Sequence, residues 1–158
     1  AHWELPETMR FPGAVAAGIE DAVGQTANSI TCLAGKQLGH RFSEQAARTD
    51  DLLSALDEVR RLLAANQCLW SFETFRHSSR PNLILAGEQG DEVMLVFRDC
   101  MIRQSLFLFG HQQKGSLCNL MFGFFAGALE RIMGRASPLE IVHAGENACL
   151  KRLLVRRA

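Results

Sequence analysis

The sequence lacks the features that define several protein classes. No apolar run reaches the roughly 18 residues that a helix needs to cross a bilayer, so we expect no membrane span. Lys plus Arg and Asp plus Glu both total 17, and this zero net charge gives no basis for direct nucleic-acid binding. The first 13 residues contain no charged segment followed by an apolar one, so we expect no secretory signal.

Catalytic and nucleotide-binding motifs are also missing. The chain contains no nucleophile elbow, no P-loop and no dinucleotide fingerprint. Residues 87–92 (GEQGDE) have two glycines, but their pattern is typical of a hairpin turn. The sequence therefore indicates no catalytic residues, and we favour a protein that is not an enzyme. Four basic residues near the C-terminus, Lys151, Arg152, Arg156 and Arg157, are interpreted as a solvated strand end.

Cysteine usage indicates a reducing compartment. The five cysteines are odd in number and widely scattered, at positions 32, 68, 100, 118 and 149. This distribution argues against a disulfide scaffold and favours buried thiols or a metal site. We therefore expect a cytoplasmic protein.

The most strongly patterned stretch is GSLCNLMFGFFAGALERIMGR, at residues 115–135. Apolar side chains recur at helical spacing around most of its circumference, which predicts a buried helix. Ser116 is the expected N-cap and Gly134 the expected C-cap. Gly123 and Gly127 lie one turn apart on one face, where we expect a close backbone approach.

The residues before this stretch predict an arm followed by helices. Residues 1–13 hold two of the four prolines and show no periodicity, so we expect an irregular arm. Helical spacing then runs through residues 14–42, and Gly24 leaves either two helices or one long helix open. A clearer helix follows, with Thr49 as its expected cap and a buried stripe that ends near Leu63.

Strand patterns occupy the remaining segments. The expected strands are residues 69–75, 82–85 and 92–97, and a terminal hairpin of residues 139–143 and 149–155. Residues 99–110 are apolar but of ambiguous period. The order is helices, antiparallel strands, a long central helix and a C-terminal hairpin, which predicts a single α+β domain over residues 14–158.

Two cysteines could meet in such a fold. Cys118 lies near the start of the central helix, and Cys149 follows the turn of the terminal hairpin. If the hairpin packs on the helix, His143 on its first strand could be a third ligand, and such sulfur and nitrogen donors suit zinc. The spacing contains no CxxC motif, so buried free thiols are the favoured interpretation of the residues alone.

Three segments match a known family in the same order. Residues 34–39 (AGKQLG) match an opening AGK-x-LG helix, residues 118–129 (CNLMFGFFAGAL) match a central C-x4-GF-x-AG-x-L helix, and residues 145–149 (GENAC) resemble a closing GD-x-x-C hairpin. On these motifs the chain resembles the 4-vinyl reductase (hydrocarbon-binding) domain family. That family shares its fold, the ligand-binding domain in NO signalling and Golgi transport, with the Bet-type subunits of the TRAPP tethering complex.

The resemblance implies a homodimeric α+β domain that buries a small hydrophobic or aromatic ligand between helices and sheet. In the phenol- and xylene-responsive activators of this family, a structural zinc is held by cysteines at the positions of Cys118 and Cys149 and by two middle ligands, a Glu/Cys pair on the first strand of the hairpin. The resemblance therefore also implies a zinc here. The hairpin is shorter here and has no cysteine on its first strand, so His143 or Glu140 would have to replace the middle ligands. The Tyr-x-Ser-x-Arg motif of haem-binding relatives is absent, and no motif for flavin or nicotinamide is present, so we expect none of these cofactors.

Nine apolar residues are the candidates for lining a ligand pocket, although plain core is the alternative for each and is expected for most of them. A tryptophan or histidine among or near them is expected to anchor a hydroxyl or carboxylate of the ligand. The candidates are Trp70, Phe72, Met101, Phe107, Phe109, Met121, Phe124, Phe125 and Leu129.

Three functions are compatible with these observations. The leading hypothesis is a non-catalytic sensor or carrier domain for a small hydrophobic ligand, which would report to a separate output protein. The second is a dimeric interaction module in which Gly24 and Gly35 serve subunit packing. The third is an accessory factor in tetrapyrrole (bacteriochlorophyll) biosynthesis.

Overall fold

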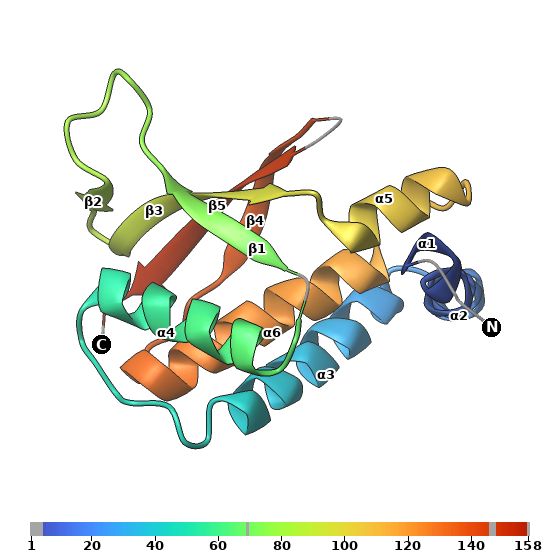
Figure 1. The fold of residues 1–158 in the computed structure, drawn as a ribbon, viewed down its shortest axis with the longest axis horizontal. Coiled ribbons are helices and arrows are strands. Elements are labelled where there is room, and N and C mark those ends of the chain that lie inside the picture. Colours follow the sequence, from blue (N-terminus) through green and yellow to red (C-terminus); the bar gives the residue numbers. More distant parts are fainter. Residues whose placement is uncertain (1–4, 69, 146–147, 158) are drawn as a thin grey trace.

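The computed structural model describes residues 5–68, 70–145 and 148–157. Figure 1 shows helices beneath an antiparallel sheet, in the predicted α+β arrangement. In chain order the elements are α1 (Leu5–Thr8), α2 (Arg10–Val23), α3 (Thr26–Phe42), α4 (Leu52–Ala65), β1 (Ser71–Phe75), β2 (Ile84–Ala86), β3 (Gly90–Arg98), α5 (Met101–Leu108), α6 (Ser116–Met133), β4 (Leu139–Ala144) and β5 (Ala148–Arg156).

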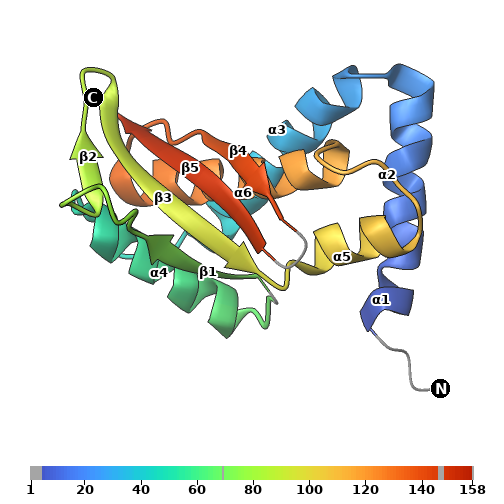
Figure 2. The same ribbon diagram turned by 90° about the horizontal axis from the view of Figure 1, so that it is seen from above.

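The sheet and the helices form two layers. The strand order is β1-β3-β5-β4, and β2 pairs with the part of β3 that β1 does not reach. Helices α4 and α6 lie against one face of the sheet, with α3 packed on α6 (Figure 1). Seen from above, no helix in the described part of the chain covers the opposite face (Figure 2). None of the described helices is long and apolar enough to cross a membrane.

Strand alternation decides which side chains face the helices. In β5 the buried positions alternate with half-buried ones, and the inward side chains are Cys149, Lys151, Leu153 and Val155. Strand β3 pairs with β5 in antiparallel register and contributes the buried side chains of Val93, Leu95 and Phe97. A lysine at an inward position is therefore the exception in an otherwise apolar row.

Helices α3 and α6 cross so closely that glycine is required on both. A Cβ atom on Gly35 would lie 2.0 Å from the carbonyl oxygen of Leu120, and one on Gly123 would lie 1.9 Å from that of Cys32. Gly39 and Gly127 face backbone at similarly short distances. The predicted close approach at Gly123 and Gly127 is confirmed.

The same contact corrects the expectation that Gly35 serves subunit packing. Gly35 packs against α6 of its own chain. Gly24 is the C-cap of α2, with φ of 61°, and it separates α2 from α3. The structure thus has two helices between residues 14 and 42, because Gly24 adopts a positive φ that ends the first.

The expectation of an irregular arm over residues 1–13 was wrong for its described part. The chain is helical from Leu5 to Thr8, and α2 begins at Arg10. Pro6 and Pro12 each lie in the first turn of a helix, where a backbone N–H has no intrahelical acceptor, so neither proline breaks the helix. Residues 1–4 lie outside the described residues.

The caps of α4 and α6 also differ from the prediction. Asp51, not Thr49, is the N-cap of α4, and its carboxylate accepts a hydrogen bond from the Ser54 backbone N–H at 2.9 Å. Ser116 is the first residue of α6 instead of its cap. Its backbone N–H and hydroxyl both donate to Glu20 on α2, so a distant carboxylate does the capping. Gly134 is a left-handed C-cap, as predicted.

The ambiguous segment 99–110 contains helix α5, whose buried residues are Ile102, Ser105 and Leu106. Their three- and four-residue spacing places them on one helical face. The predicted strands are all present with shifted ends, although Leu69 and the turn residues 146–147 lie outside the described residues.

We expect Gly123→Ala to lower the free energy of unfolding by at least about 2 kcal/mol, because the new methyl group meets backbone that can move only with the whole of α3. Gly18→Ala on α2 is the matched control, since no atom lies within 4 Å of its added Cβ. Helix propensity should make that variant more stable, by up to about 1 kcal/mol. Urea denaturation measures both, and equal stabilities would contradict the crossing.

Candidate functional site

Six aromatic rings meet between the helices and the sheet. We call them the aromatic cluster: Phe42, Trp70, Phe72, Phe97, Phe124 and Phe125. They come from α3, the segment before β1, β1, β3 and α6. Phe124 and Phe125 are adjacent in α6. The close glycine contacts between α3 and α6 flank this part of the helix.

The rings contact one another mainly edge to face. Phe125 lies with its ring centroid 5.2 Å from Phe72 and 5.3 Å from Phe97, at angles near perpendicular. Phe124 makes similar contacts with Phe42 at 5.5 Å and with Trp70 at 5.7 Å. This geometry directs ring edges toward ring faces and contributes about 0.5–1.5 kcal/mol per pair beyond simple burial.

The Trp70 end of the cluster is the part open to solvent. Trp70 and Phe42 are only partly buried, whereas Phe124 beneath them is 1% exposed. The indole Nε1 of Trp70 is nonetheless buried and has no hydrogen-bond partner among the described residues. A buried N–H without an acceptor costs about 1–3 kcal/mol, so this donor is a candidate ligand contact.

Six of the nine predicted pocket residues lie in this region. Trp70, Phe72, Phe124 and Phe125 belong to the aromatic cluster, and Met121 and Leu129 belong to the same core. The three candidates from residues 99–110 lie elsewhere or at its edge. Phe107 is 76% exposed, Met101 is partly exposed, and the Phe109 ring lies under the guanidinium of Arg10 at 4.8 Å.

Two members of the cluster were missed in the sequence. Phe97 shares the inward alternation of Val93 and Leu95, and that period could have identified it. Phe42 is the last residue of α3, and its contact with Phe124 depends on how α3 crosses α6. No local pattern indicates that crossing.

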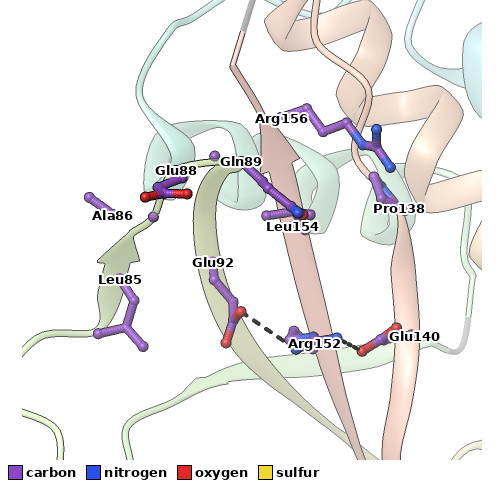
Figure 3. Close-up of a pocket in the computed structure, with 12 residues that line it drawn as sticks. Leu85, Ala86, Glu88, Gln89, Glu92, Pro138, Glu140, Arg152, Leu154 and Arg156 are labelled. Atoms are coloured by element: carbon purple, nitrogen blue, oxygen red, sulfur yellow. Dashed lines mark hydrogen bonds and ion pairs between the residues drawn. The ribbon is translucent and has the colours of Figure 1, made fainter.

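A separate groove of about 620 Å³ lies beside the far face of the sheet (Figure 3). Arg152 lies between Glu92 and Glu140 there and forms an ion pair with each. One guanidinium thus bridges two carboxylates at the centre of this groove. This groove and three other surface grooves contain none of the nine predicted pocket residues.

Cys118 and Cys149, the predicted metal ligands, are both buried and interact electrostatically with each other and with Cys100. Burial raises the pKa of both thiols, and the nearby Lys151 amine acts in the opposite direction. Burial in turn lowers the pKa of Lys151, which the three cysteines oppose. Lys151 is 1% exposed, so its assignment to a solvated strand end was wrong.

His143 does not join the two cysteines. It pairs with Leu150 across the hairpin, whereas Ala144 pairs with Cys149, and successive residues of a strand point to opposite faces. A bulge between Ile141 and His143 shifts the register there, and His143 is exposed. Over the described residues, no three His, Cys, Asp or Glu side chains are grouped so that they could hold a metal ion.

Comparison with known structures identifies a similar fold. The phenol-responsive sensory domain of the transcription activator PoxR, solved with phenol, matches with a TM-score of 0.66. The match covers 98% of this chain and 75% of that one, at 14% sequence identity. No family model matches the sequence, and no curated protein resembles it significantly. The shared fold agrees with the resemblance drawn from the sequence motifs.

We expect the thiols of Cys118 and Cys149 to react at least about tenfold more slowly than that of Cys68 in the native protein at pH 8. Burial raises the pKa of all three thiols, but Cys118 and Cys149 are buried from reagent whereas Cys68 is only partly buried. Timed alkylation followed by peptide mass spectrometry measures each rate. Denaturant should remove the difference, and rapid native labelling of Cys118 would contradict the placement.

Proposed function

We propose that this chain is a non-catalytic sensor or carrier domain that binds a small aromatic ligand at the Trp70 end of the aromatic cluster. The observation that carries the proposal is the buried Trp70 Nε1, which has no acceptor among the described residues and lies beside several aromatic rings. A ligand with one polar oxygen on an aromatic ring would supply both the acceptor and the apolar surface.

The chemistry of the cluster favours binding over catalysis. Its members other than Trp70 are phenylalanines, which offer packing but no group that transfers protons or attacks a substrate. Phe42 and Phe124 would contact the ligand ring by their edges, as they contact each other at 5.5 Å. The similar fold of a phenol-responsive domain supports a ligand of this class.

The hydrogen-bond assignment can be tested with p-cresol and toluene, which differ by one hydroxyl group. We expect Trp70→Phe to weaken p-cresol binding by about 3- to 10-fold, because one buried hydrogen bond is lost, and to leave toluene binding nearly unchanged. Isothermal titration calorimetry measures both affinities. Phe75→Leu, on β1 and outside the cluster, is the control and should change neither.

Two results would count against the proposal. The first is wild-type protein that binds neither compound and carries no small molecule in native mass spectrometry after mild purification. The second is an equal loss of p-cresol and toluene affinity in Trp70→Phe, which would assign the indole a packing role only.

A second candidate function, a dimeric interaction module, rests on the outer surface of α2. Val15, Ile19 and Val23 repeat every four residues and therefore form one stripe along the helix. They are 44%, 37% and 45% exposed, although their periodicity is that of a buried face. On α3, Ile30 and Leu33 are exposed to a similar degree. We infer that a second copy of the chain covers this stripe.

The dimer can be tested by light scattering coupled to size-exclusion chromatography. We expect the wild type to elute at twice the chain mass and Ile19→Glu to elute as a monomer, because a buried unpaired carboxylate is costly. Val142→Glu is the matched control, since Val142 is an exposed apolar residue on β4, outside the stripe. A wild type that remains monomeric at about 100 μM, where even weak dimers associate, would remove this candidate.

A further inference from the structure

Lys151 is a lysine buried in the interior at the middle of β5, with 1% of its surface exposed. Its Nζ lies 4.1 Å from the centroid of the Phe97 ring and 5.1 Å from that of Phe122. It also donates a hydrogen bond to the Met121 sulfur, at 3.5 Å. These contacts join β5 to β3 and to α6.

Three thiols also lie near this amine. Lys151 interacts electrostatically with Cys100, Cys118 and Cys149. No ion pair links it to a carboxylate anywhere in the described ranges. Lysine is almost never fully buried unless it is paired, so its position among three cysteines and two rings needs a specific explanation.

The family resemblance implies a structural zinc among these cysteines, and the residues present do not fit one. A structural zinc requires four ligands in a tetrahedron, chiefly thiolate and imidazole. The predicted third ligand, His143, is on the opposite face of the hairpin. Within the part of the chain that the structure describes, Cys100, Cys118 and Cys149 are not grouped so that they could hold a metal ion. The group that interacts with all three thiols is the Lys151 side chain, whose ammonium offers hydrogen-bond donors and no lone pair for a metal.

We propose that the side chain of Lys151 takes the place of the structural metal and joins the hairpin to α6 without one. A metal would connect Cys118 on α6 to Cys149 on β5, and Lys151 connects the same two elements through Met121 and Phe122. The aromatic faces of Phe97 and Phe122 stabilise the amine end, as electron-rich rings stabilise cations. The three cysteines remain as buried free thiols.

The metal content of the wild type is the first test. Protein produced in zinc-supplemented medium should contain far less than one zinc per chain by elemental analysis. Its urea midpoint should not change in EDTA, whereas a structural zinc site would lose much of its folding energy. About one zinc per chain that is lost in both Cys118→Ser and Cys149→Ser would overturn the proposal.

Replacement of the amine is the second test. Lys151→Cys replaces the amine with a fourth thiol, and we expect it to bind cobalt(II) at least about tenfold more tightly than the wild type, with a thiolate charge-transfer band. Adding Cys118→Ser should abolish the gain. Arg152→Cys is the matched control, because it adds a thiol at the next position of β5, on the outer face of the sheet.

The two tests separate the outcomes. If Lys151→Cys binds cobalt no better than Arg152→Cys, the amine is not what excludes the metal, and the proposal fails. Circular dichroism establishes whether Lys151→Cys is folded. If it is not, the zinc content of the wild type still decides the question, because that measurement needs no variant.

Discussion

The backbone contact between α3 and α6 is the constraint on which the other features depend. Glycines on both helices allow carbonyl oxygens to lie where a methyl group would otherwise be, as at Gly35 and Gly123. This contact sets how closely α3 packs on α6. It brings Phe124 against Phe42 of α3 and leaves Phe125, the next residue, to contact the sheet at Phe72 and Phe97. A wider crossing would separate the two halves of the aromatic cluster.

The interior therefore has two chemically different regions along α6. Toward its N-terminus, Cys118, Met121 and Phe122 face the amine of Lys151. One turn later Phe124 faces Trp70, whose indole N–H has no acceptor in the described structure. Burial of a polar group costs free energy in either region, but the two polar groups differ in the partners that surround them. The amine has rings and sulfur around it, whereas the described residues leave the indole N–H without an acceptor.

Much of the fold could be predicted because it depends on local patterns. The periodicity of α6, its glycines and the alternation of β3 and β5 identify the layers from the sequence alone. Tertiary partners could not be predicted in the same way. Glu20 caps α6 from 96 residues away, and Phe42 joins the cluster only through the helix crossing. Lys151 was misassigned because its charge was weighted above its inward position in β5.

Phe97 connects the two regions. Its ring contacts Phe72 and Phe125 in the aromatic cluster, and the Lys151 amine lies over it at 4.1 Å. Edge-to-face contacts are sensitive to ring orientation, and a cation–ring contact is strongest over the face of the ring. A ligand that reoriented the cluster would therefore also alter the contact that holds β5. An aliphatic side chain at position 97 could fill the same volume, but it could not link these two interactions.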